Sequence, residues 1–360
     1  MTANNLQLIQ GCLLGGAVGD ALGAPVEFMS LASIRTKYGL AGISNYSPVY
    51  GRIGAITDDT QMTLFTAEGL LRAYVRANLR GICSIPSVVC GAYLRWLETQ
   101  KRSYKRRKKG TGGWLYHVPE LWSQRAPGNT CLSALEAMKS GKADSRAPND
   151  SKGAGGIMRV GPAAMMYAGQ GNKALDVFCL AMECAWLTHG HPSGFLSAAA
   201  YAVVLHAVLC GKSTKEGIDA SRSLLIEHPD HAEVLHAIDA AVRLADDDIS
   251  DDEAIQELGE AWVGEEALGI ALFCSLRAKN LETGVMLAVN HDGDSDTTGI
   301  LVGQLLGAKY GLSAIPERWL ENLELRDVLM TIATDLSEHE SWNLDEYDYD
   351  ENIVARYPGG

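Results

Sequence analysis

Apolar residues recur at intervals of three and four along most of the chain, which is the period of helices with one buried face. Runs of four to eight residues that alternate apolar and polar side chains, as half-buried strands do, are not apparent. The pattern therefore predicts an all-α fold, a compact multi-helix bundle whose loops carry the chemistry. The predicted helices cover residues 5–22, 61–71, 87–99, 131–138, 160–167, 174–186, 195–209, several stretches of 214–276, 284–289 and 300–308.

Glycines are frequent in two segments, residues 31–56 and the first predicted helix. Residues 31–56 contain Gly39, Gly42, Gly51 and Gly54, which predicts irregular backbone with several turns. The first helix has four glycines among its apolar residues, although each glycine costs a helix about 1 kcal/mol relative to alanine. That composition predicts a central helix that another backbone approaches closely.

An acidic, glycine-punctuated turn lies between two apolar helices at residues 291–299 (HDGDSDTTG). Uncompensated carboxylates beside buried structure are costly. One interpretation is that Asp294, Asp296 and Thr297 only cap the following helix, whose N-terminal amides favour oxygen and negative charge. The other is a metal site, since Mg²⁺, Mn²⁺ and Ca²⁺ all prefer oxygen ligands.

A second cluster of the same kind, residues 57–60 (TDDT), also precedes a helix. One helix start needs one cap and not two adjacent aspartates between threonines. If the two helix starts converge, four aspartates and two threonines face one or two metal ions. The predicted ligands are Thr57, Asp58, Asp59, Asp294, Asp296 and Thr297.

Two further acids follow or end the first helix. Asp20 lies in its apolar part and must be hydrogen-bonded or paired if it is buried, so we interpret it as a structural acid near the site. Glu27 comes just after the turn that ends this helix, at Gly23 to Pro25. From the residues alone, Glu27 is either a solvated loop glutamate or an acid that reaches the metal cluster.

Two loops could contact a substrate. Residues 151–159 (SKGAGGIMR) precede an apolar helix, and the bare amides of such a glycine loop can bind phosphate, although the loop matches neither a Walker loop nor a dinucleotide fingerprint. His189 and His191 interrupt two apolar helices at 188–194. Each histidine could bind a metal, a phosphate or a ribose, or could serve only as a structural hydrogen-bonding group.

Composition narrows the classes of function. A formal net charge of −13 over 360 residues argues against general binding to nucleic acid or a membrane surface. Eight cysteines without metal-type spacing predict reduced thiols in a cytoplasmic protein, and neither a signal peptide nor an apolar run long enough for a membrane span is evident. We predict one domain over 1–335, which includes a basic loop at 101–110, and an acidic tail over 336–360 that either folds back onto that loop or stays disordered.

Taken together, five motifs resemble those of the ADP-ribosylglycohydrolase family and occur in the same order. They are GDALG at 19–23 with Glu27, TDDT at 57–60, GGIMR at 155–159, Thr188-His189 and DGDSDT at 292–297. The resemblance covers about residues 11–311. It implies a compact all-α domain with a binuclear Mg²⁺ or Mn²⁺ centre at the base of a cleft, held by the six predicted ligands.

The resemblance also implies roles for the other residues. Glu27 would contact the metal, the reactive water or the substrate, and either Glu27 or Asp59 would act as the catalytic carboxylate. The diphosphate and ribose of the substrate would lie against Ser151, Gly153, Gly155, Gly156 and His189. A further acid that some arginine-directed members carry between the two metal motifs has no clear match around residues 114–117.

The function implied is removal of ADP-ribose from protein side chains, most simply from ADP-ribosylarginine. Such an enzyme would reverse a regulatory modification or one made by an ADP-ribosyltransferase toxin, and we expect a monomer with an ADP-ribosylated protein as its partner. Two alternatives stay open at this point. One is a hydrolase of small ADP-ribosyl compounds or ADP-ribosylserine, and the other is a non-catalytic ADP-ribose-binding protein.

Overall fold

The computed structural model describes residues 3–101, 103–106, 112–144, 146–345 and 347–359. Within these residues the regular structure is entirely helical, and the only β-type pairings are three isolated bridges. The prediction of an all-α fold is confirmed. The helices are α1 (Ala3–Gly23), α2 (Leu31–Tyr38), α3 (Asp58–Arg80), α4 (Ile85–Lys101), α5 (Asn129–Lys139), α6 (Gly161–Met165), α7 (Ala174–Trp186), α8 (Pro192–Leu209), α9 (Thr214–Leu225), α10 (Ala232–Asp246), α11 (Asp251–Leu258), α12 (Gly264–Arg277), α13 (Leu281–Val289), α14 (Ser295–Tyr310), α15 (Glu317–Leu320), α16 (Arg326–Glu338) and α17 (Glu351–Arg356).

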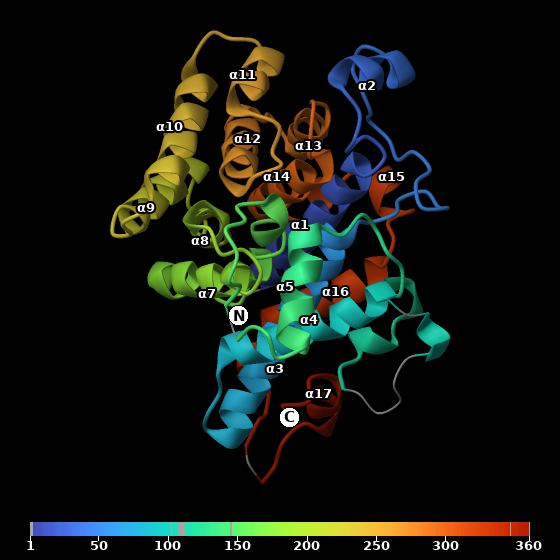
Figure 1. Cartoon of the computed structure of the whole chain (residues 1–360), viewed down its shortest axis with the longest axis vertical. Coiled ribbons are helices and arrows are strands. Elements are labelled where there is room, and N and C mark those ends of the chain that lie inside the picture. Colours follow the sequence, from blue (N-terminus) through green and yellow to red (C-terminus); the bar gives the residue numbers. More distant parts are fainter. Residues whose placement is uncertain (1–2, 102, 107–111, 145, 346, 360) are drawn as a thin grey trace.

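Helices α1 and α14 form the centre of the molecule, with α7 to α12 gathered on one side of them (Figure 1). The glycines of the two helices face each other in antiparallel order, Gly11 against Gly307, Gly15 against Gly303 and Gly19 against Gly299. A Cβ atom at Gly19 would lie 1.9 Å from the carbonyl oxygen of Gly299. The glycines therefore permit backbone contact between the helices, as predicted for the first helix.

This antiparallel pairing places the end of α1 beside the start of α14. Gly23 packs against Ser295 and Asp296, where a Cβ atom would meet the Ser295 carbonyl oxygen at 2.4 Å. The loop that follows α1 consequently begins next to the acidic turn. The sequence positions of Glu27 and Asp296 are far apart, but the helix pair brings them together.

Residues 31–56 are less irregular than predicted. They begin with helix α2, whose N-terminus is capped by the Ser30 side chain, which accepts a hydrogen bond from the Ser33 amide at 3.2 Å. The helix buries only Ile34 and ends at Gly39, which has a φ of 93°. Such a short helix with one buried residue lacks the repeated apolar pattern on which the prediction depended.

The start of helix α5 contacts the glycine loop. The helix begins at Asn129, its N-cap is Gly128, and no side chain caps it. The Thr130 hydroxyl instead lies 3.0 Å from the hydroxyl of Ser151 in the glycine loop. Because the Thr130 hydroxyl contacts Ser151, it does not accept a hydrogen bond from the backbone N–H groups at the start of α5.

The acidic tail packs against α16 through its few apolar and aromatic residues. Tyr357 is buried, stacks on Trp342 at 5.6 Å between ring centroids, and donates a hydrogen bond to Asp335 at 2.5 Å. Arg356 forms an ion pair with the same aspartate at 2.9 Å. Residues 102 and 107–110 of the basic loop lie outside the described residues, and the division between domain and tail stays a prediction.

Helix α8 has the length and hydropathy of a membrane span, with a mean hydropathy of 1.5 over 18 residues. This helix differs from the prediction that no apolar run is long enough for a membrane span, because Ser193, Ser197 and His206 interrupt its apolar sequence. In the structure 94% of this window is buried inside the fold. Its apolar surface is covered by neighbouring helices, as in a core helix of a globular domain.

Candidate metal and substrate site

The starts of α3 and α14 converge, as the two acidic motifs required. Asp58 and Asp59 form the first turn of α3, and Asp296 and Thr297 lie in the first turn of α14. The Thr297 hydroxyl donates to Oδ2 of Asp59 at 2.9 Å. All six predicted ligands are at most 8% exposed, so two acidic segments that are remote in sequence share one buried site.

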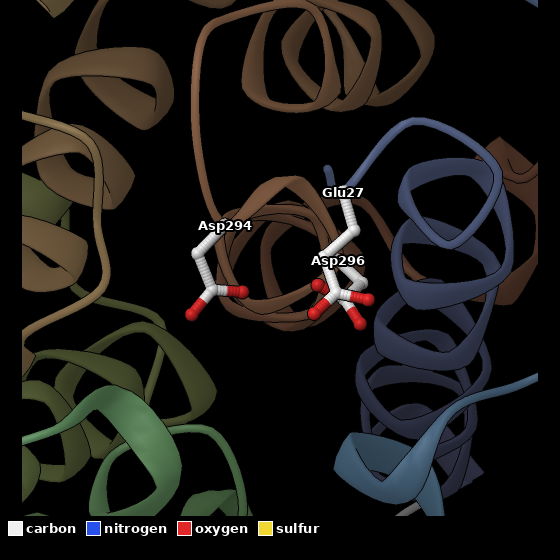
Figure 2. A group of neighbouring side chains, drawn as sticks. All are labelled: Glu27, Asp294 and Asp296. Carbon is white, nitrogen blue, oxygen red and sulfur yellow. The ribbon is translucent and has the colours of Figure 1, made fainter. Parts of the chain in front are cut away.

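Glu27 belongs to this site and is not a solvated loop residue. It is 7% exposed, and one oxygen each from Glu27, Asp294 and Asp296 lie within 4.8 Å of one another. Figure 2 shows the three carboxylates directed into one space, Glu27 from the loop after α1 and the aspartates from the start of α14. Such a set of oxygens is one that a hard divalent cation binds.

Burial and mutual repulsion favour the protonated form of these acids. Burial, followed by the charges of Asp296 and Asp294, raises the pKa of Glu27 to about 11. Burial and the Asp296 charge likewise raise the pKa values of Asp58, Asp59 and Asp294. The cluster holds more negative charge than its surroundings neutralise.

The surroundings fit a divalent cation because they supply no other positive charge. Among the described residues, none of Glu27, Asp58, Asp59, Asp294 and Asp296 forms an ion pair with a lysine, arginine or histidine. Oε2 of Glu27 is buried and has no hydrogen-bond donor. Buried charges are ordinarily paired or coordinate metals, so this group is suited to a divalent cation.

Asp20 organises the first acidic motif from behind. Its carboxylate accepts the backbone N–H groups of Thr57 and Thr60 at 3.0 and 3.1 Å and the Thr60 hydroxyl at 2.5 Å. The side chain is fully buried at the end of α1. The structural role predicted for Asp20 is confirmed, because three donors of the 57–60 turn converge on it.

An inner cavity of about 220 Å³ opens above the acids. Of the five predicted substrate residues, Gly153, Gly155 and His189 line it, whereas Ser151 and Gly156 do not. The Gly156 backbone packs against α8, where a Cβ atom would meet the Gly194 carbonyl oxygen at 2.8 Å. Gly153 and Gly155 of the glycine loop thus form part of the cavity wall, and Gly156 packs the same loop against α8.

His189 is held in one orientation by the residues beneath the cavity. The Thr188 hydroxyl lies 2.8 Å from Nδ1 of His189 and accepts a hydrogen bond from Arg159 at 2.6 Å. Burial, and next the charge of Arg159, lowers the pKa of His189 to about 3. The ring is therefore neutral at physiological pH and presents a hydrogen-bonding group without charge.

Sequence reasoning missed the other residues of the cavity wall. They come from the turn before α5, from the first residues of α5, from the glycine loop and from the loop before α12, namely Ala126, Gly128, Asn129, Thr130, Cys131, Ala154, Met158 and Trp262. Trp262 is 40% exposed and stacks on Phe28, with ring centroids 5.7 Å apart. Trp262 stands directly before a helix in a chain with few aromatic residues, and this was the feature of the sequence that could have indicated its place in the cavity wall.

A larger outer cavity of about 430 Å³ adjoins the site, and Trp262 lines both cavities. Its lining contains four acids and neither lysine nor arginine. Asp252 is already paired with Arg35 at 2.7 Å, and Glu266 accepts the N–H groups of Glu260 and Ala261. The lining as a whole favours a cationic group beside the acidic cluster.

Comparisons with known proteins agree with this site. The chain matches the family ADP-ribosylglycohydrolase over residues 1–345. An uncharacterized protein of Archaeoglobus fulgidus is 31% identical over 342 residues, which cover 91% of this chain and 95% of that protein. The ADP-ribosyl-(dinitrogen reductase) glycohydrolase of Rhodospirillum rubrum is 26% identical over 323 residues, covering 88% and 90% of the two chains.

A solved structure, described as an ADP-ribosylglycohydrolase-related protein complex, has the same fold. It superposes with a TM-score of 0.68 at 27% identity, and the match covers 94% of this chain and 99% of that one. The family match, the shared fold and the buried acidic cluster concern the same residues. This chain belongs to the ADP-ribosylglycohydrolase family.

Proposed function

We propose that this protein is a metal-dependent hydrolase that removes ADP-ribose from modified protein side chains, with ADP-ribosylarginine as its main substrate. The observation on which the proposal rests is the group formed by Glu27, Asp294 and Asp296, unpaired and buried at the base of a cavity. The relative from Rhodospirillum rubrum bears a name that describes removal of ADP-ribose from a protein.

The ligands of two divalent ions, Mg²⁺ or Mn²⁺, would come from this group together with Asp58, Asp59 and the hydroxyls of Thr57 and Thr297. Bound there, the ions would neutralise the carboxylates, hold ribose hydroxyls and lower the pKa of a water molecule. Without such ions, burial and the neighbouring carboxylates favour the protonated form of Glu27, whose pKa is raised to about 11.

Glu27 is the acid best placed to take a proton from the attacking water. Asp59 already accepts the Thr297 hydroxyl at 2.9 Å, whereas Oε2 of Glu27 is free of any donor. Cleavage at C1 of the ribose develops positive charge on the sugar, and the surrounding carboxylates stabilise that charge. Gly153, Gly155 and His189 would hold the diphosphate and ribose against the cavity wall.

The arginine linkage is supported by the outer cavity. A guanidinium group is a permanent cation, and the lining of the neighbouring cavity contains four acids and neither lysine nor arginine. Of the four lining acids only Asp252 forms an ion pair among the described residues, whereas Asp292, Glu260 and Glu266 accept only N–H hydrogen bonds there. A serine linkage leaves a neutral hydroxyl as the departing group and gains nothing from this charge.

The first experiment is to measure release of free ADP-ribose from an arginine-ADP-ribosylated protein, with Mg²⁺, with Mn²⁺ and with a chelator. Release should require the metal and should be lost in the Asp58→Asn and Asp296→Asn variants. Asp248→Asn, an exposed acid between α10 and α11, is the matched control and should retain full activity.

Parallel assays with serine-linked peptides and small ADP-ribosyl compounds decide between the proposed substrate and the first alternative. Faster release from either of these would reject the arginine assignment. Tight binding of ADP-ribose without turnover of any conjugate would instead support a non-catalytic binding protein. Reversal of a regulatory or toxin-made modification, a cytoplasmic location and a monomeric state stay predictions that these assays do not address.

A further inference from the structure

A buried ion pair lies behind the first acidic motif and outside the cavity. Glu324, on the turn between α15 and α16, is 2% exposed and binds Arg125 through two hydrogen bonds of 3.0 and 3.2 Å. Arg125 is itself 6% exposed. Neither side chain lines the inner cavity or belongs to the acidic group, so the pair has no direct contact with a substrate.

The same pair joins two segments that are distant in sequence. Glu324 accepts the Ile56 amide at 3.1 Å with its side chain and donates its own amide to the Gly54 carbonyl at 2.9 Å. Arg125 donates to the Ile56 carbonyl at 3.3 Å. The segment that leads into the TDDT motif is therefore fastened to the loop before α5.

Both fastened segments converge on Asp58. Its backbone N–H donates to the Arg125 carbonyl at 3.0 Å, and the backbone of Gly128, three residues further along, hydrogen-bonds to its carboxylate. Ala126, which has a φ of 55°, and Gly128 line the inner cavity together with Asp58. Movement of the Arg125 loop would thus move both the backbone and the carboxylate of Asp58.

We propose that Glu324 and Arg125 are positioning residues that fix the direction of Asp58 toward the metal site and thereby set the affinity for the ion. The inference rests on the proposed function only in taking the acids to be metal ligands. A buried bidentate pair suits this role because its planar geometry fixes orientation as well as distance. Partners of this kind outside the ligand shell commonly alter metal affinity by about 10–100-fold.

The test measures Mn²⁺ binding by calorimetry in folded protein, with Glu324→Gln as the main variant. Glutamine keeps the shape of the side chain but removes the charge that holds Arg125. We expect Mn²⁺ affinity to fall by about 10-fold or more. Amide hydrogen exchange at Asp58, whose N–H bonds to the Arg125 carbonyl, should accelerate in the same variant.

Two control variants separate positioning from general destabilisation. Arg52→Met removes the third, partly exposed partner of Glu324, at 3.1 Å, and leaves the bidentate pair in place. Asp335→Asn breaks another buried contact, the one between α16 and Arg356. Both should leave Mn²⁺ affinity and Asp58 exchange within about twofold of the wild type.

If Glu324→Gln does not fold, Arg125→Lys keeps the positive charge but loses the paired geometry, and the same loss of affinity is expected. Folded variants of the pair that bind Mn²⁺ as tightly as the wild type would overturn the proposal, as would a wild type that binds no Mn²⁺. Neither readout involves substrate, so absence of ADP-ribose release would refute the proposed function without deciding this one.

Discussion

Asp20 and Thr60 are joined by a hydrogen bond of 2.5 Å between the threonine hydroxyl and Oδ2 of the aspartate. Asp20 lies in the last turn of α1, and Thr60 lies in the first turn of α3. The contact links the central helix to the first acidic motif, while Gly23 links the same helix to the second. Helix α1 is thereby the frame on which the two halves of the site are aligned.

The first prediction concerns that contact. In Asp20→Asn the amide group offers one acceptor oxygen in place of the two that now receive the donors of the 57–60 turn. We expect affinity for Mn²⁺ and kcat/KM to fall by about 10–100-fold, as for other groups that orient metal ligands. Calorimetric titration and the release assay measure the two effects. Unchanged metal affinity in this variant would show that the turn keeps its shape without Asp20.

The second prediction is that Asp296→Asn lowers the hydrolytic activity and at the same time raises the stability of the metal-free protein. Burial raises the pKa of Asp296, and its charge in turn raises the pKa values of Glu27, Asp58 and Asp59. Asp296→Asn removes this repulsion, so the free energy of unfolding in chelator should rise by roughly 1–3 kcal/mol. Hydrolysis should fall by about 10³-fold or more.

Denaturant unfolding with and without Mg²⁺ checks the stability part of this prediction. The wild type should gain more stability from Mg²⁺ than the variant does, because the variant lacks one ligand. Asp335→Asn is the control, since Asp335 is buried but paired with Arg356, and its loss should destabilise the protein. A metal-free Asp296→Asn protein less stable than the wild type would contradict the account of the cluster.

The third prediction concerns pH. The pKa of Glu27 is raised to about 11 in the folded protein, above its value of 4.5 in an unfolded chain, so the folded state holds a proton that the unfolded state has released. Stability of the metal-free protein should therefore fall as pH rises from 7 to 8, by up to about 1.4 kcal/mol per pH unit from this group. The pKa of the buried histidine His189 is lowered to about 3, so its contribution makes stability rise with pH, but only below pH 7.

Metal binding displaces the same proton, so stabilisation by Mg²⁺ should grow over the same pH range. Thermal unfolding at pH 7 and 8, in chelator and in Mg²⁺, measures both trends. Glu27→Gln should make the pH dependence in chelator shallower, and the difference between wild type and variant isolates this group from the cysteines and from the other buried acids, whose pKa values are also raised. Equal slopes for the two proteins would refute the assignment of the proton to Glu27.

The fourth prediction separates binding from acid–base catalysis at His189. Because its pKa is lowered to about 3, His189 should contribute no inflection to the profile of kcat/KM between pH 5 and 8. Its replacement by glutamine should raise KM by about 10-fold, as the loss of a well-oriented hydrogen bond at a cavity wall does, with a smaller change in kcat. If the pH profile of kcat/KM has an inflection that disappears in His189→Gln, the histidine titrates during catalysis.

The sequence contained enough to predict the helical fold and the two acidic motifs. Both were visible because each depends on local order, an apolar period of three to four in one case and adjacent oxygen ligands in the other. Glu27 stayed ambiguous, since its burial depends on the packing of α1 against α14, almost three hundred residues away. Glycines in α1 indicated a close neighbour but did not identify which helix it was.

Other parts of the site had weaker signals. Trp262 reaches the cavity because the segment before α12 lies between the acidic turn and the glycine loop, with the Ala154 amide bound to the Trp262 carbonyl at 3.1 Å. The resemblance implied that Ser151 contacts the substrate, but in the structure its hydroxyl lies 3.0 Å from that of Thr130. The positions of Trp262 and Ser151 depend on how separate loops pack against each other. A local pattern in one sequence does not contain that information.

The last prediction tests the central helix pair itself. In Gly19→Ala the new Cβ atom would lie 1.9 Å from the Gly299 carbonyl oxygen, a distance that forces α1 and α14 apart. We expect a loss of about 1–3 kcal/mol in the free energy of unfolding. Gly171→Ala is the matched control, because Gly171 is exposed and a Cβ atom there meets nothing within 4 Å. Since α1 positions Glu27 and α14 positions Asp296, the folded Gly19→Ala protein should also bind Mn²⁺ more weakly than the Gly171→Ala protein. A variant that is destabilised but binds Mn²⁺ normally would show that the acidic cluster keeps its geometry independently of the spacing between the two helices.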